Sequence, residues 1–221
     1  MKMRLTIILI FFAFSCRPNA EPAKDDIHYE TKTIAFTKDD ESSPLGFWET
    51  NVEYPLLLEV NPAHKKVNEA ITKIAEEFTC DNGKGDKEFL AEITLLNADI
   101  MSLKYSDSWY CEGMANTQGR TGSAIFNLAN GNEIKVDNEL SEDRSKLEIR
   151  IRDDFIQSIK NKGVDCPEPR PAFSYLAKNE MVFVNYSDDE DSVQCEVEAR
   201  IPSTEFRKFV KTGSELSKLT N

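Results

Sequence analysis

Four of the five cysteines in this 221-residue chain constrain its fold more than any other sequence feature. Cys80, Cys111, Cys166 and Cys195 include no CxxC pair, and only two histidines accompany them, so a zinc site is not indicated. An even number of cysteines in an exported chain predicts two disulfides, for which three pairings exist. We favour Cys80–Cys111 and Cys166–Cys195, because each pair joins neighbouring predicted elements. Each would close a loop of about 30 residues, worth roughly 3.5 kcal/mol.

The start of the chain predicts export. A basic beginning is followed by an apolar run at residues 5–14, and then by Ser15 and Cys16 before the sequence turns polar. This order is typical of a signal peptide, and about ten apolar residues are too few to cross roughly 30 Å of hydrocarbon. We therefore interpret 1–15 as a signal peptide, Cys16 as the lipidation site of a membrane-anchored envelope lipoprotein, and 16–26 as its tether. The alternative is a plain secretory signal followed by an unmodified cysteine.

The charge of the chain limits its partners. The formal net charge is -12, and it becomes -14 once Lys2 and Arg4 are removed with the leader. An acidic surface repels nucleic acid and anionic lipid, both of which need a positive patch. The composition therefore favours a basic partner or plain solubility, and no nucleic acid.

Two helices are predicted from apolar spacing. Asn61 is a good N-cap and Pro62 suits the first helical position. One helical face then follows, made by Val67, Ile71, Ile74 and Phe78. A second helix is predicted at 143–162 with Gly163 ending it, and its face is made by Leu147, Ile151, Phe155 and Ile159. We interpret His64, in the first turn of the first helix, as a surface residue.

The remaining pattern predicts strands and one α+β domain. Strands are expected at 27–36, 47–55, 88–96, 100–105, 123–128, 133–136, 173–176, 181–186 and 193–201, with a last short helix from Ser203. Asn130-Gly131 is the strongest short hairpin signal, because both turn positions need positive φ. Hairpins outnumber crossovers, which favours mainly antiparallel sheet with helices packed on one side. The domain is expected to span 27–221, with two subdomains at about 27–110 and 111–221 as the alternative.

The most unusual segment is 109–120, which we expect to be a loop. It holds aromatic, sulfur-containing and polar side chains among small residues, and the candidate partner-binding residues are Trp109, Tyr110, Glu112, Met114 and Asn116. Aromatic anchors with adaptable polar neighbours suit recognition of a partner. The alternative is that the two aromatic side chains simply pack over a disulfide at Cys111.

Three stretches together carry a family resemblance. They are Tyr54-Pro55-Leu56-Leu57; residues 101–131, with Tyr110 to Asn116 and Phe126 to Gly131; and Val197 to Phe206. Over about residues 50–210 the chain resembles the domain of unknown function at the C-terminus of a lysozyme-sensing anti-sigma factor, with its companion domain from peptidoglycan deacetylases. In that family a Tyr-x-Gly-Gly-Ala-His-Pro loop precedes the hairpin. Here Met114 replaces the second glycine and Asn116 stands in place of the histidine. The resemblance implies an envelope module that binds lysozyme, a basic protein, or cell-wall glycan.

Catalytic signals do not stand out. The sequence has no GxSxG or HExxH motif and no evident triad, and nothing singles out a pair of carboxylates among 39 acids. The acidic run 187–191 lacks the glycine and ligand spacing of a calcium loop, so we interpret it as a solvated turn. We therefore predict a binding module with no cofactor, metal or catalytic residue. The alternatives are a cell-wall enzyme of unrecognised type and a structural surface lipoprotein without ligand.

Overall fold

The computed structural model describes residues 27–58, 61–77, 80, 83–186 and 195–219. The strands are β1 (Tyr29–Asp39), β2 (Phe47–Leu57), β3 (Gly85–Leu96), β4 (Ile100–Cys111), β5 (Gln118–Asn127), β6 (Phe173–Ala177), β7 (Glu180–Asn185) and β8 (Val197–Pro202). The helices are α1 (Pro62–Glu76), α2 (Val136–Glu139), α3 (Arg144–Lys162), α4 (Ser203–Phe206), the 3-10 helix η2 (Arg207–Phe209) and α5 (Glu215–Leu219). The predicted signal peptide, Cys16, the tether, Phe78 and the acidic run 187–191 lie outside the described residues. No helix among the described residues has both the length and the apolar composition needed to span a membrane.

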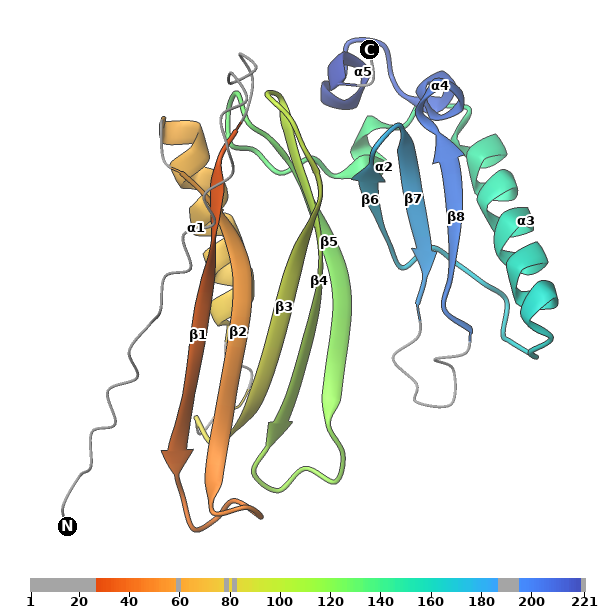
Figure 1. The fold of residues 1–221 in the computed structure, drawn as a ribbon. Coiled ribbons are helices and arrows are strands. Elements are labelled where there is room, and N and C mark those ends of the chain that lie inside the picture. Colours follow the sequence, from red (N-terminus) through yellow and green to blue (C-terminus); the bar gives the residue numbers. More distant parts are fainter. Residues whose placement is uncertain (1–26, 59–60, 78–79, 81–82, 187–194, 220–221) are drawn as a thin grey trace, which may run out of the picture.

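The strands form two sheets that lie side by side (Figure 1). The large sheet has the order β1-β2-β3-β4-β5, and the small sheet has the order β6-β7-β8. Every neighbouring pair is antiparallel except β2 and β3, which run parallel. The exception arises because α1 forms the crossover between these two strands. The predicted α+β class with mainly antiparallel sheet is confirmed.

Helix α1 packs on one face of the large sheet, behind β1 and β2 in Figure 1. Its N-terminus forms as predicted, because the Asn61 side chain accepts a hydrogen bond from His64 N at 2.9 Å. Val67 and Ile71 are buried in a core that the sheet completes with Tyr54, Phe89, Met101 and Phe126. The prediction that His64 lies on the surface is wrong, since it is only 5% exposed. His64 lies three residues before Val67, so it shares the buried face of the helix.

Helix α3 packs beside β8 and covers the small sheet (Figure 1). Its four predicted apolar residues are all buried, and Gly163 ends it in the left-handed conformation at φ 69°. Ile100 and Ile125 of the large sheet belong to the same core. Leu176 N also donates to the buried Ser102 Oγ at 3.0 Å. The small sheet and α3 therefore cover the β4–β5 part of the large-sheet face opposite α1.

The predicted hairpin at Asn130-Gly131 is only partly present. The turn exists: Gly131 N donates to Asn127 O at 2.8 Å, but only Gly131 of the two turn residues has positive φ. A Cβ at Gly131 would lie 2.6 Å from Ala63 O, so packing against α1 also requires glycine. The predicted strand 133–136 is wrong, because Glu133 forms a single bridge and α2 begins at Val136. The chain leaves the sheet there and places Ile134 in the core shared by the two sheets.

Both favoured disulfides are confirmed. The Cα atoms of Cys80 and Cys111 lie 5.4 Å apart, and those of Cys166 and Cys195 lie 5.8 Å apart. The first ties the segment after α1 to the end of β4. A Cβ at Gly85 would lie 2.6 Å from Cys80 Sγ, so the close approach of this disulfide to β3 requires glycine.

Candidate functional site

The predicted recognition residues lie at one end of the large sheet, where β4 turns into β5. The prediction that 109–120 forms one loop is wrong, because β4 continues to Cys111 and Trp109 pairs with Gln118 of β5. Only 112–117 connects the strands. Consecutive strand residues face opposite sides of a sheet, but at this end of the sheet Trp109 and Tyr110 both line one groove. Their role in binding stays a prediction.

Trp109 lies on the α1 side of the sheet, next to a buried cluster of charges. Lys87 Nζ lies 3.0 Å from Asp107 Oδ1, and their side chains are 2% and 0% exposed. Arg120 reaches the other carboxylate oxygen of Asp107 at 2.9 Å, and its guanidinium carbon lies 5.9 Å from the Trp109 ring centre. Asp107 therefore pairs with two cations. These ion pairs connect β3, β4 and β5 on the α1 side of the sheet, near the end of the β4–β5 hairpin.

Tyr110 lines a groove of about 350 Å³ at the end of the sheet, and its ring centre lies 6.3 Å from that of Trp48. Most residues of the groove lie on the side of the sheet that α1 does not cover, which we call the open face. The groove is lined by residues of four segments: Leu45, Phe47, Glu49, Asn51, Asp86, Lys87, Glu88, Ser108, Trp109, Tyr110 and Thr117. Leu45 at its edge is 75% exposed. The groove thus combines aromatic rings with carboxylates.

The turn beside this groove is held by its own contacts. Glu112 N donates to Lys84 O at 3.1 Å, and the Glu112 carboxylate lies 3.6 Å from Lys84 Nζ. Met114 N donates to Cys111 O at 3.0 Å, while Met114 Sδ accepts from Cys111 N at 3.4 Å. Asn116 is exposed. Together with the Cys80–Cys111 disulfide, these contacts define one conformation of the turn.

The open face carries a row of acids that the sequence analysis missed. Its members come from alternate positions of β2 and β3, and they are Glu49, Glu53, Asp86, Glu88 and Glu92. Within the described part of the chain, only Glu92 has an ion-pair partner, Lys104 Nζ at 3.4 Å. The signal was present in the sequence, because acids alternate with buried residues along both strands.

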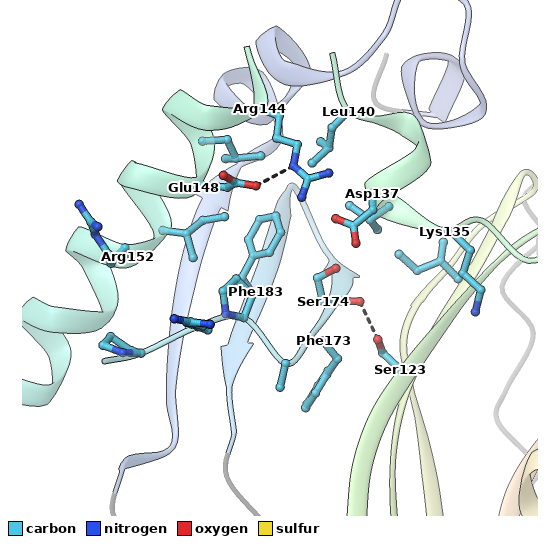
Figure 2. Close-up of a pocket in the computed structure, with 18 of the residues that line it drawn as sticks. Ser123, Lys135, Asp137, Leu140, Arg144, Glu148, Arg152, Phe173, Ser174 and Phe183 are labelled. Atoms are coloured by element: carbon cyan, nitrogen blue, oxygen red, sulfur yellow. Dashed lines mark hydrogen bonds and ion pairs between the residues drawn. The ribbon is translucent and has the colours of Figure 1, made fainter. Parts of the chain in front are cut away.

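A larger cleft of about 790 Å³ lies between the large sheet and the half of the molecule that contains the small sheet. It is bounded by β5, α2, the first half of α3 and residues 168–174 (Figure 2). Its charged groups pair with one another. Arg144 Nε donates to Glu148 Oε1 at 2.6 Å, and this hydrogen bond, helped by the charge of Asp137, raises the pKa of Arg144. Arg152 lies 3.9 Å from Glu168. The cleft is therefore large enough for a ligand, but many of its charged side chains already form ion pairs with one another.

Neither concave region presents a recognisable catalytic arrangement. Among the residues that the structure describes, no three histidine, cysteine or acidic side chains come close enough to hold a metal ion. The acids and aromatic side chains of the open face can instead contact positively charged and apolar groups of a partner, as in a binding site.

Comparisons with known proteins agree with the fold. No protein-family model and no curated protein sequence matches this chain. A DUF3298 family member from Bacteroides fragilis, 13% identical, superposes with a TM-score of 0.61 and covers 87% of this chain and 97% of its own. A DUF3298 family protein from Pseudomonas aeruginosa PAO1, 10% identical, has a TM-score of 0.64 and covers 86% of this chain and 96% of its own. At such identities the likeness shows the fold alone. The resemblance to the lysozyme-sensing anti-sigma factor stays a prediction.

Proposed function

We propose that this chain is a binding module of the bacterial cell envelope, and that its open face binds a basic protein of the lysozyme kind. The observation that carries the proposal is the acidic row on the open face. Glu49, Glu53 and Glu88 are exposed and have no cation within ion-pair distance in the described residues. Aromatic side chains border the same surface at Phe47 and Tyr110.

Electrostatics favours a positively charged partner. Neighbouring strands lie roughly 4.8 Å apart, and like charges on adjacent strands destabilise a sheet. Lysine and arginine side chains of a partner would relieve this repulsion. The net charge of -12 would also attract a basic protein over longer distances and speed association at low salt.

The aromatic side chains of Phe47 and Tyr110 add apolar contacts to the electrostatic attraction. Exposed apolar and aromatic groups beside charged ones are typical of the centre and rim of protein interfaces. The disulfide between Cys80 and Cys111 fixes the adjoining turn before a partner arrives. Less ordering is then needed on binding, which favours affinity.

The test is a titration of the purified protein, with both disulfides formed, into hen lysozyme. Calorimetry measures affinity, and a turbidity assay on cell walls measures the lytic rate. We expect the triple variant Glu49→Gln, Glu53→Gln, Glu88→Gln to weaken binding by about 30-fold, or about 2 kcal/mol. The loss should shrink at high salt, because screening reduces the contribution of exposed charges.

A matched control removes three exposed acids of the other half, Glu142→Gln, Asp153→Asn and Glu196→Gln. This control changes net charge equally, so its affinity should fall by less than the open-face variant. Equal losses in the two variants, or no binding by the unmodified protein, would contradict the proposal. A slower lytic rate would identify an inhibitor, whereas binding with unchanged lysis would identify a sensor or scavenger.

The proposed location of the module is a membrane of the cell envelope, on its periplasmic side or at the cell surface, where a lipid on Cys16 anchors it. The support is the sequence order of basic start, apolar run and cysteine. Fractionation of cells that express the unmodified protein and Cys16→Ser tests it. We expect the first in the membrane fraction and the second released or unprocessed, and an equal distribution would contradict the anchor.

A further inference from the structure

The outermost strand of the large sheet, β1, has an edge that no described strand covers. It borders the sheet, with β2 on one side and no described strand on the other (Figure 1). Its 11 residues pair with β2 without a register shift, and they include neither proline nor glycine. A long, regular edge strand is a template for another strand, and proteins usually shorten, bend or cover such edges. The β1 edge is therefore a surface on which a further strand can pair.

The backbone groups of every second β1 residue point toward this edge. His28 O accepts from Leu58 N at 3.0 Å, and Asp40 N donates to Gly46 O at 3.0 Å. Because backbone hydrogen bonds in an antiparallel pair alternate between the two sides of a strand, the even-numbered residues between them bond to β2. The odd-numbered residues of 29–39 therefore direct their N–H and C=O groups outward, where no described backbone group pairs with them.

The other sheet edges are obstructed or short. Leu176 N of β6 donates to Ser102 Oγ of the large sheet at 3.0 Å. On β5, the Ser123 hydroxyl donates to Ser174 O of the small sheet at 2.6 Å. Strand β8 has 6 residues and ends at Pro202, which has no N–H group to donate. Among the described strands, β1 thus combines length with an open edge.

The side chains of β1 match those of a second copy of the same strand in one register. Two antiparallel β1 strands can join their outward groups only where odd-numbered residues lie opposite odd-numbered ones. If the two-fold axis passes at Ile34, Glu30 lies opposite Lys38 of the other copy, and the contact occurs twice by symmetry. Thr31 then lies opposite Thr37. Opposite charges and paired threonines both stabilise cross-strand contacts.

Neighbouring registers lose this match. An axis one residue later in the chain would place Lys32 opposite Lys38, and an axis one residue earlier would place Glu30 opposite Phe36. Glu30 and Lys38 are exposed and have no ion-pair partner among the described residues. Lys32, in contrast, already pairs with Glu76 at 2.7 Å. The two charges that the matched register brings together are therefore the two that lack a partner.

We propose that β1 binds the β1 strand of a second copy of this chain, so that the two large sheets form one continuous sheet in a symmetric dimer. The two-fold axis is perpendicular to the sheet, so both α1 helices lie on one side and both open faces on the other. Helix α1 packs mainly against β2. The two β2 strands lie three strand spacings apart, roughly 14 Å, which leaves room for helices that need about 8–10 Å.

The dimer also covers an exposed aromatic side chain. Phe36 is 51% exposed in the single chain, and in the matched register it lies opposite Lys32 of the other copy. The acidic row of the open face belongs to β2 and β3 and takes no part in this contact. Dimer formation and partner binding can therefore fail independently.

Sedimentation equilibrium of the purified protein, with both disulfides formed, tests the dimer. We expect the mass to rise from that of one chain toward that of two between micromolar and millimolar concentrations. Glu30→Lys and Lys38→Glu each replace two attractions by two repulsions, so each should weaken dimer formation by about 30-fold. An equal mixture of the two variants restores opposite charges at both contacts and should form a mixed dimer as tightly as the unmodified protein.

Matched controls reverse exposed charges elsewhere. Glu142→Lys and Lys178→Glu change the net charge by the same amounts and should leave dimer formation unchanged. The mass of a single chain at millimolar concentration would overturn the proposal. Equal dimer formation by Glu30→Lys and Glu142→Lys would overturn it as well, since the contact would then not involve β1 in this register.

Introduced cysteines measure the register directly. Ile34→Cys and Phe36→Cys are each made together with Cys16→Ser, because the other four cysteines form the two disulfides. At position 34 the Cα atoms of the two copies would lie about 4.5–5.5 Å apart, within the range of a disulfide. At position 36 they would be four residues out of register, roughly 13 Å apart. Mild oxidation should therefore link only the Ile34→Cys chains, as seen by electrophoresis without reductant. Equal linking of both variants, or of neither, would contradict the proposed register and overturn the proposal.

Discussion

The two halves of the molecule differ in how far their charged and polar side chains find partners within the protein. In the half built on the small sheet, several charges are matched: Arg150 lies 3.1 Å from Asp154, Arg200 contacts Glu180 and Glu198, and the Tyr175 hydroxyl donates to Glu198 at 2.8 Å. In the half built on the large sheet, the described residues include an acidic row in which only Glu92 has a matching cation, and a buried indole donor, that of Trp48, without an acceptor.

We infer from this difference where a partner would bind. A buried donor without an acceptor reduces stability, and so do like charges placed side by side on a sheet, unless a ligand or partner satisfies them. Features of this kind collect on the two faces of the large sheet, while the small sheet and α3 cover the β4–β5 part of the open face. We therefore propose that the large-sheet half carries recognition and that the small-sheet half supports it.

The largest effect is expected at the buried charge cluster of the large sheet. Asp107→Ala should reduce the free energy of unfolding by about 3–5 kcal/mol, because it leaves the buried Lys87 unpaired. Urea denaturation measures the loss. The double variant Lys87→Met with Asp107→Leu should recover most of it, since it leaves no isolated charge. A loss below about 1 kcal/mol for the single variant would show that the cluster is solvated.

The two disulfides are matched for a comparison between the halves. They span 31 and 29 residues, so replacing either pair by alanine should cost a similar amount, about 3.5 kcal/mol. The two disulfide variants should differ, however, in their affinity for lysozyme. Only loss of Cys80–Cys111, which fixes the turn beside the open-face groove, should weaken lysozyme binding as measured by calorimetry at a temperature where both variants are folded. Equal weakening by both would refute a division of roles.

A much smaller effect is expected at the surface charges of the small sheet. Arg200 is 52% exposed, and exposed ion pairs are worth about 0–1 kcal/mol. Arg200→Met should therefore reduce the free energy of unfolding by no more than about 1 kcal/mol. The contrast with Asp107→Ala is the informative quantity. Similar losses in the two variants, in the same urea experiment, would contradict the assignment of buried and exposed pairs.

The smallest effects should appear at the extremes of pH, one in each half. Hydrogen bonds from the Ser42 hydroxyl and backbone lower the pKa of Asp40 to about 2, so its contribution is present above its ordinary value and lost as pH falls through about 2. Burial, with the hydrogen bond to Glu198, raises the pKa of Tyr175 to about 12. The contribution of Tyr175 is present below its ordinary value of 10 and lost as pH rises through about 12.

NMR titration of the two side chains measures these pKa values directly. Asp40→Asn should flatten the acid limb of the stability curve and leave the alkaline limb unchanged. Tyr175→Phe should do the reverse. Ordinary pKa values for both groups would remove the basis of this prediction.

The sequence predicts those parts of the fold that local signals determine. Apolar spacing identified α1 and α3, Asn61 and Gly163 marked their ends, and the favoured cysteine pairing is present. Errors arose where tertiary contacts decide the outcome. Pairing with β5 extends β4 through Trp109, and beyond the single bridge at Glu133 and the hydrogen bond from Ile134 N to Ile125 O the chain turns into α2 instead of continuing as a strand.

The candidate sites show the same limit. The acids of the open face could have been found from their alternation along β2 and β3. The unsatisfied donor of Trp48 could not, because whether an indole N–H finds an acceptor depends on every element packed around it.

The most direct test of recognition by the open face is an NMR map of the lysozyme contact on the ¹⁵N-labelled protein. We predict that unlabelled lysozyme shifts the backbone amide signals of Glu49–Glu53 and Asp86–Glu92, and those of the turn at 112–117. The signals of α1 and of the cleft in Figure 2 should stay in place. Shifts confined to that cleft, or no shifts at saturating lysozyme, would contradict the assignment of partner binding to the open face.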